Sequence, residues 1–290
     1  MQPTSLSRII QDTHALPSIP GVASRLLERL QDPETHAAEI STLIEMDPAL
    51  SLKVLQLANS AMFAPASPVH SIERAIMLLG FNTVRFLITG VAVLQVAQKM
   101  PENEIINPEN FWRSAFRGAV AAKYFAEQSN YPESNEAYLA GLIREIGKIA
   151  LIQCAYETYL SVVKAAQNAN VAVVHKEREI LGFTHADVGA LLAVKWNLDE
   201  GLASVIAAYP FPGDHPELNN LHLATVLHLA DRFAALETPT AAHFEQILAE
   251  LDPLAIQYWS QEQGRNLSPE SLEMDWQALK SQLDQGNPFI

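Results

Sequence analysis

Cysteine is almost absent from this chain, because Cys154 is the only one among its 290 residues. A single thiol cannot form an internal disulfide or supply the several thiolates of a cysteine metal cage. Its apolar neighbours, Ile149 to Ala155, favour a packing role over a reactive one. The composition therefore excludes a disulfide-bonded scaffold, and it agrees with a protein of a reducing cytoplasm.

Positive charge is also scarce, since 19 Lys and Arg residues stand against 33 Asp and Glu residues and leave a net charge of −14 at pH 7. Such a chain lacks the general electrostatic attraction that holds nucleic acid phosphates. We therefore expect no nucleic acid partner, and the charge favours a protein partner.

Long hydrophobic runs are missing as well. The most apolar region, 76–97, is interrupted by Gly80, Asn82, Arg85 and Gln95, so it falls short of the ~18 apolar residues that a membrane-spanning helix needs. The amino-terminal residues show no basic segment followed by an apolar run, which a signal peptide would have. We expect a cytoplasmic protein without a membrane partner.

The glycine patterns of phosphate loops and dinucleotide sites do not occur, and no Ser/His/Asp or Cys/His nucleophile arrangement can be identified. Alternating strand-like runs joined by Asn-Gly or Asp-Gly turns are missing too. The chain is therefore predicted to be all-α, with no cofactor and no catalytic nucleophile.

Apolar residues recur with helical spacing along nearly the whole chain. The dipeptide Asp47-Pro48 predicts a helix start, because aspartate caps the first turn and proline lacks a donor that the first turn would leave unpaired. Gly80 is predicted to separate two helices. The predicted helices cover 22–30, 37–45, 48–59, 71–79, 81–94, 109–128, 134–152, 155–168, 172–181, 184–194, 199–208, 219–235, 240–252 and 268–285.

Proline-rich and polar segments suggest the domain organisation. Leu16 to Pro20 should be extended, the polar segment 101–108 is the best candidate for a domain junction, and the tail 285–290 is expected to fray. We therefore predict a helical bundle over 8–104, a second helical lobe over 105–237 and a carboxyl-terminal helical extension over 238–290.

Several ordered motifs carry a family resemblance over residues 8–235. They include Leu16-Pro-Ser-Ile-Pro20, Asp47-Pro-Ala-Leu50, Phe111-Trp-Arg113, the segment Ala140–Lys148 and His185-Ala-Asp-Val-Gly-Ala190. Together they resemble the HDOD family, the HD-related output domain of bacteria. The resemblance implies an all-α, two-lobed helical bundle whose second lobe is similar to HD-domain phosphohydrolases, without their activity, and a role in bacterial signalling.

The resemblance also locates a degenerate metal site. Metal-active HD proteins use a helical His, a His-Asp pair, further histidines and a final Asp, and these positions map here to Ser114, Arg144-Glu145, His185 and Asp231. The stretch Ala207-Ala208-Tyr209, where one branch of the superfamily has additional histidines, has none. Arginine is a permanent cation that repels a metal ion, so we expect neither a metal nor a catalytic residue.

Alternatives stay open for the surviving positions. Glu145, His185 and Asp231 could ligate a hard divalent ion, but His185 also suits a capping or packing role at a helix start, and Asp231 also suits an ion pair with a neighbour. Arg144 itself could pair with Glu145 or Asp231 and so replace the charge of the lost metal.

Basic residues suggest another possibility. Arg113 and Arg117 are four residues apart, as are Arg144 and Lys148, so each pair should share one helical face. If the two faces converge, these four cations could bind a phosphate or a nucleotide without a metal.

The sequence thus predicts a non-catalytic bacterial regulatory protein of HDOD type that acts through a protein partner. Two alternatives remain. One is a metal-dependent HD-type phosphohydrolase with an altered site built from Glu145, His185 and Asp231, and the other is a metal-free sensor of a nucleotide or another anion.

Overall fold

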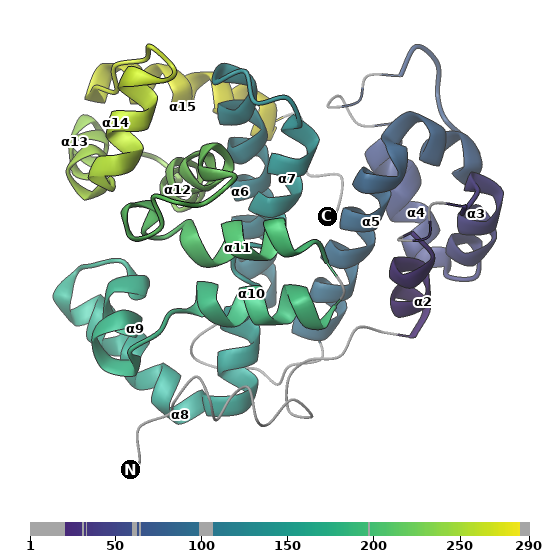
Figure 1. Ribbon diagram of the computed structural model, residues 1–290, viewed down its shortest axis with the longest axis horizontal. Coiled ribbons are helices and arrows are strands. Elements are labelled where there is room, and N and C mark those ends of the chain that lie inside the picture. Colours follow the sequence, from purple (N-terminus) through teal and green to yellow (C-terminus); the bar gives the residue numbers. More distant parts are fainter. Residues whose placement is uncertain are drawn as a thin grey trace.

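The computed structural model describes residues 21–30, 32, 34–59, 63, 65–98, 107–196 and 198–284. Within these ranges every regular element is a helix, as the sequence predicts (Figure 1). The predicted extended segment 16–20, most of the predicted junction 101–108 and the tail 285–290 lie outside the described residues.

The first lobe consists of helices α2 (Gly21–Arg29), α3 (Ala37–Glu45), α4 (Pro48–Ala58) and α5 (Ile72–Gln98). Helix α4 begins where the sequence predicts, because the backbone N–H of Leu50 donates to Asp47 Oδ1 at 3.1 Å. Gly80 divides α5 with φ 76° and ψ 157°, a conformation that favours glycine, so the predicted division is confirmed. Helices α2, α3 and α4 all pack against α5.

The second lobe contains the remaining helices. They are α6 (Pro108–Gln128), α7 (Ser134–Ile143), α8 (Ile146–Ala169), α9 (Val173–Leu181), α10 (His185–Lys195), α11 (Glu200–Ala208), the 3₁₀ turn η1 (Pro212–Asp214), α12 (Leu221–Ala234), α13 (Ala241–Glu250), α14 (Pro253–Gln261) and α15 (Pro269–Asp284). Helix α6 packs against α7 and α12, while α10 packs against α8 and α11. Ser114, His185 and Asp231 of the predicted metal site lie on α6, α10 and α12, and Arg144-Glu145 lies between α7 and α8.

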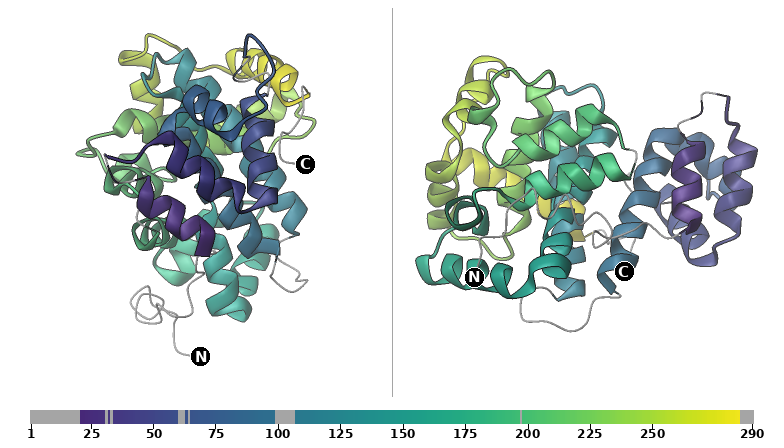
Figure 2. Two further views of the ribbon diagram at one scale, coloured as in Figure 1. Left: turned by 90° about the vertical axis from the view of Figure 1, so that its right-hand side faces the viewer. Right: turned by 60° about the horizontal axis from the view of Figure 1, so that its bottom comes forward.

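The two lobes lie side by side, with α2–α4 on the far side of α5 from the second lobe (Figures 1 and 2). Their contact runs through α5 and α7. A Cβ atom on Gly90 would lie 2.5 Å from Leu142 Cδ2, so glycine permits the close approach of the two helices. Buried apolar side chains from both lobes form one continuous core. The predicted two-lobed helical architecture is confirmed.

The predicted carboxyl-terminal extension, α13 to α15, packs against α6 and α12 of the same lobe. The Tyr124 hydroxyl of α6 donates to Asp275 Oδ1 of α15 at 2.9 Å, and Arg265 pairs with the same carboxylate. The boundaries at 104 and 237 stay a prediction. No helix in the described part of the chain combines the length and the apolar character needed to cross a bilayer.

Two helix predictions are wrong. The predicted helix 134–152 is broken, since α7 ends at Ile143 and α8 begins at Ile146. The sequence pattern also predicted no helix at the position of α14, which follows closely after α13. In both places two helices follow one another with almost no connecting residues. Hydrophobic periodicity barely changes across such a break, so it does not predict the break.

Candidate functional site

The pair Arg144-Glu145 lies in the break between α7 and α8. Arg144 keeps helical backbone angles (φ −53°, ψ −31°), whereas Glu145 departs from them (φ −99°, ψ 8°). Arg144 and Lys148 therefore do not share one face of a continuous helix, and that part of the sequence argument is wrong.

The glycines on either side of this pair, Gly141 and Gly147, allow neighbouring helices to approach closely. A Cβ atom on Gly141 would lie 2.6 Å from the carbonyl oxygen of Gly118 on α6, and one on Gly147 would lie 1.8 Å from the carbonyl oxygen of His185 on α10. Neither approach leaves room for a side chain. Glycine on each side of Arg144-Glu145 is thus required by the contacts of α7 with α6 and of α8 with α10.

The Arg144 guanidinium is only 1% exposed and joins three helices. Its Nε donates to Asp231 Oδ1 of α12 at 2.8 Å, and Nη1 donates to the carbonyl oxygen of Gly141 at 2.9 Å. Nη2 donates to Ser114 Oγ of α6 at 3.3 Å and lies 3.5 Å from Glu145 Oε2. Of the two alternatives for Arg144, the internal ion pair is present, and it includes both carboxylates.

Gly118 creates the space for this guanidinium. A Cβ atom on Gly118 would lie 2.1 Å from Arg144 Nη1 and 2.5 Å from Cζ. The guanidinium therefore lies directly against the backbone of α6, where any other residue would displace it.

Glu145 is held by several donors. Lys148 Nζ pairs with Oε1, and the Ser114 hydroxyl donates to Oε2 at 3.0 Å. Burial alone would raise the pKa of the Glu145 carboxyl, but the charges of Lys148 and Arg144 hold that pKa well below its usual range.

Asp231 and Arg144 are also ionised. Burial alone would raise the pKa of Asp231, yet the Arg144 charge keeps the pKa below its usual value. Burial would lower the pKa of Arg144, but Glu145 and Asp231 raise the pKa above that of a free guanidinium. Opposite charges stabilise one another here, and the cluster of Arg144, Lys148, Glu145 and Asp231 carries no net charge.

His185 is engaged through both ring nitrogens. Nδ1 lies 2.7 Å from Glu177 Oε2 and Nε2 lies 2.8 Å from the Tyr209 hydroxyl. Because a carboxylate can only accept, Nδ1 carries a proton, and in the neutral imidazole the tyrosine donates to Nε2. The Tyr159 hydroxyl donates to the other Glu177 oxygen at 2.7 Å. Tyr209 belongs to the stretch to which the family resemblance maps additional histidines, and here its hydroxyl bonds to Nε2 of His185.

A divalent metal, which the HD phosphohydrolase fold would imply, does not fit these residues. The Asp231 and Glu145 carboxylates already accept from Arg144, Lys148 and Ser114, and His185 has no free ring nitrogen. A cation bound to the carboxylates would also lie against the buried guanidinium, which would repel it. In the part of the chain that the structure describes, no group of three or more His, Cys, Asp or Glu side chains could hold a metal ion.

The four basic residues of the anion hypothesis do not surround one pocket. Arg113 pairs with Glu109 at 2.9 Å on the surface of α6. Arg117 lies 3.9 Å from Glu237 and its guanidinium stands over the Trp276 ring at 5.5 Å. Only Arg144 and Lys148 line the cavity at the predicted site.

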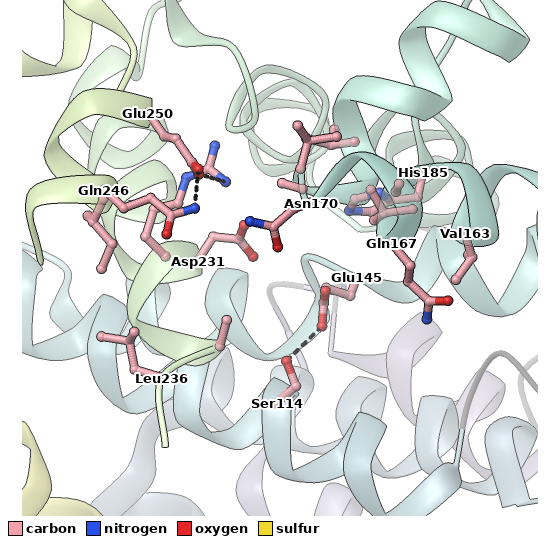
Figure 3. A pocket seen from close by; sticks show the side chains of 18 of the residues that line it. Ser114, Glu145, Val163, Gln167, Asn170, His185, Asp231, Leu236, Gln246 and Glu250 are labelled. Atoms are coloured by element: carbon pink, nitrogen blue, oxygen red, sulfur yellow. Dashed lines mark hydrogen bonds and ion pairs between the residues drawn. The ribbon is translucent and has the colours of Figure 1, made fainter. Parts of the chain in front are cut away.

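That cavity has a volume of about 610 Å³ and opens above the charge cluster. Ser114, Glu145, His185 and Asp231 all face it, from α6, the break before α8, α10 and α12 (Figure 3). Its rim comes from the end of α8, the start of α9 and helix α13, including Asn170 and Gln246. A smaller hollow of about 290 Å³ adjoins it and shares Ser114, Glu145 and Lys148. The predicted site residues are thus one constellation in space, although Ser114 and Asp231 are far apart in sequence.

Comparison with known proteins identifies the family. The sequence profile of the HDOD domain matches residues 16–210. The chain belongs to the HDOD family. An uncharacterized protein of Treponema pallidum is 26% identical over 252 residues, which is 85% of this chain and 47% of that protein. The chain thus spans about half the length of this relative.

Solved structures of the same fold include three bacterial proteins. A Shewanella amazonensis protein, named as a candidate phosphohydrolase, is 23% identical with a TM-score of 0.72 and coverage of 97% of this HDOD chain and 98% of its own. An HDOD protein of unknown function from Geobacter sulfurreducens is 20% identical with a TM-score of 0.63 and coverage of 92% and 93%. A candidate signal transduction protein of Marinobacter aquaeolei is 24% identical, with a TM-score of 0.58 and coverage of 95% and 61%. These likenesses show the fold.

Sequence reasoning missed three residues that shape the site, namely Gly118, Tyr209 as the partner of His185, and Arg232 of the cavity wall. Gly118 gave one available signal, since glycine within a strongly helical segment indicates close packing. Tyr209 and Arg232 gave none, because their partners are set by tertiary packing.

Proposed function

We propose that this HDOD protein is a regulatory protein without catalytic activity, which acts by binding another protein. The observation that carries the proposal is the position of the Arg144 guanidinium, bonded to Asp231 and adjacent to Glu145. These are the carboxylates that a hydrolytic metal would need, and a permanent internal cation neutralises them instead.

The metal-dependent phosphohydrolase alternative is less well supported. A catalytic metal needs several donors around an open position for water, whereas His185 is bonded on both nitrogens. Purified protein supplied with Mn²⁺ should therefore neither retain the metal nor hydrolyse a phosphodiester such as bis-p-nitrophenyl phosphate. Hydrolysis that disappears in the Glu145→Gln variant would overturn the non-catalytic part of the proposal.

Exposed apolar side chains support the protein-binding part. Met77, Leu78 and Phe81 flank the bend at Gly80 in α5, and Met46 and Leu52 lie at the end of α3 and within α4, all substantially exposed. Exposed apolar side chains that lie together indicate an interaction site more often than scattered single ones do, and Met77, Leu78 and Phe81 lie within five residues of one another. The candidate signal transduction protein that shares the fold is consistent with such a role.

The test compares two matched methionines. Met77 of the first lobe is 68% exposed and Met274 of α15 is 67% exposed, so Asp at either position should leave the core intact. Chemical cross-linking in a bacterial lysate, followed by mass spectrometry, should detect a partner of the wild-type chain that is lost in Met77→Asp and kept in Met274→Asp. Equal retention in both variants, or no specific partner at all, would contradict binding through the first lobe.

A further inference from the structure

Arg232, on α12, is a cation of the cavity wall whose hydrogen-bonding capacity is hardly used. Its side chain is only 9% exposed, and Nη1 lies 4.0 Å from the Glu250 carboxylate, which is too far for a hydrogen bond. Its Nε is buried without a hydrogen-bond partner among the described residues. A buried N–H group without an acceptor is costly, so the site lacks an acceptor that a ligand could supply.

The first turn of α9 faces the same cavity. Ala172 precedes this helix of nine residues and gives it no side-chain cap, while Ala172, Val173 and Val174 all line the cavity. The first backbone N–H groups of a helix have no internal partner and attract anions. Burial and then the Arg232 charge lower the pKa of His175 in this turn, which places the guanidinium within electrostatic range of the turn.

We propose that this cavity binds a small organic oxyanion, whose charged group lies between Arg232 and the first turn of α9. Phosphate esters and carboxylates share the chemistry that a guanidinium fork and helix N–H groups recognise. The body of the ligand would lie against the aliphatic wall formed by Val163, Leu236 and Ile247, in a cavity of about 610 Å³, a size that suits small molecules. Arg144 and Lys148 are not the anchors, because Glu145 and Asp231 already neutralise them.

Glu250 is the internal competitor of such a ligand. Its carboxylate is the ion-pair partner of Arg232 at 4.0 Å, and Gln246 Nε2 donates to the same carboxylate at 2.8 Å. Both residues line the cavity (Figure 3). Removing the Glu250 charge while keeping its shape should leave Arg232 free for the ligand, so Glu250→Gln is expected to strengthen binding.

Isothermal titration calorimetry of the full chain with phenyl phosphate and with benzoate tests the proposal. We expect heat with at least one probe, and the tighter one identifies the anionic group. Arg232→Gln should weaken that binding by about tenfold or more, since a charge-assisted bidentate contact is lost. Glu250→Gln should strengthen it severalfold, a gain that misfolding cannot produce, and Arg113→Gln is the matched control that should leave it unchanged.

Two results would overturn the proposal. One is the absence of binding of both probes in the wild type and in Glu250→Gln. The other is equal affinity in the wild type and in a folded Arg232→Gln variant, checked by its helical circular dichroism. Neither result bears on the partner protein, which the two methionine variants test separately.

Discussion

The Nε atom of Arg144 lies 2.8 Å from Oδ1 of Asp231, and this contact links the break between α7 and α8 to the last turn of α12. The two residues are 87 positions apart in the sequence. The family resemblance maps both residues to metal-ligand positions of HD phosphohydrolases, and here the Arg144 guanidinium stabilises the Asp231 carboxylate instead.

Arg144→Met should destabilise the protein strongly. The substitution keeps an apolar stem but leaves Asp231 without its guanidinium, and removing one partner of a buried ion pair typically costs about 3–5 kcal/mol. Urea unfolding followed by circular dichroism measures the change in unfolding free energy. Adding Asp231→Asn should recover part of the loss, because the unpaired carboxylate is then neutral.

Arg113→Met is the matched control for that experiment. Arg113 also pairs with a carboxylate, Glu109, but on the exposed surface of α6. Such pairs contribute about 0.5 kcal/mol or less. Similar losses of unfolding free energy in Arg113→Met and Arg144→Met would show that the buried pair stabilises the protein no more than the surface pair does.

Gly118→Ala should destabilise the protein through Arg144. The new Cβ atom would lie 2.1 Å from Nη1, so the guanidinium must move away from Asp231, at a cost of about 1–3 kcal/mol. Gly21→Ala, with no atom of the described residues within 4 Å of the new Cβ, should cost nothing. In an Arg144→Met background the effect of Gly118→Ala should shrink, and an undiminished loss there would refute the proposed clash.

Local signals predicted most of the helices, and one of them was overlooked. Asp47-Pro48 correctly predicted the start of α4, and Asp252-Pro253 is the same signal. In the structure the backbone N–H of Leu254 donates to Asp252 Oδ1 at 2.8 Å, and Pro253 is the first residue of α14. The weak amphipathic pattern after residue 238 concealed a helix that its cap alone could have predicted.

The site was predictable only in part. Motif order along the chain was enough to name Ser114, Glu145, His185 and Asp231, which the fold does bring to one cavity. The partners of these residues were not predictable from spacing, because the Arg113/Arg117 pair and the Arg144/Lys148 pair have the same spacing, yet only the second pair lines the cavity. Burial and long-range contacts decide between them, and periodicity carries neither.

Three tyrosines should respond differently to the loss of their hydroxyl groups. Tyr209 donates to His185 and Tyr159 donates to Glu177, so Tyr209→Phe and Tyr159→Phe should each cost about 1–3 kcal/mol by leaving a buried acceptor unpaired. The Tyr138 hydroxyl is buried with no hydrogen-bond partner in the described ranges. Tyr138→Phe should therefore be neutral or stabilising, and thermal unfolding of the three variants gives the comparison.

Acid should lower the unfolding free energy of the protein in two pH ranges. In the lower range the carboxylates Glu145 and Asp231 become protonated. Glu145 and Asp231 have folded-state pKa values below their ordinary values of 4.5 and 3.8. Their ion pairs therefore add stability above those values, and the stability is lost as the pH falls below about 4. The Glu145→Gln variant should lose less stability in this window than the wild type does.

The upper window belongs to His228 of α12. Its Nε2 accepts from the backbone N–H of Asp252 at 3.0 Å, so its proton is on Nδ1, which donates to the Tyr209 carbonyl oxygen at 2.9 Å. Burial, followed by the Arg232 charge, lowers the pKa of His228 from 6.5 to about 4. Between these pH values the unfolded chain binds a proton that the folded chain does not, so stability falls as the pH drops from 6.5 to about 4 and this contribution then levels off.

The expected loss from His228 is roughly 3 kcal/mol across that window. Urea unfolding of the wild type and His228→Gln at several pH values measures it, since the variant has no imidazole to titrate and should show a shallower decline. His70→Gln changes an exposed histidine and should keep the wild-type slope. If the slopes of the His228→Gln and wild-type proteins coincide between pH 6.5 and 4, His228 does not keep its neutral, bridging form in solution.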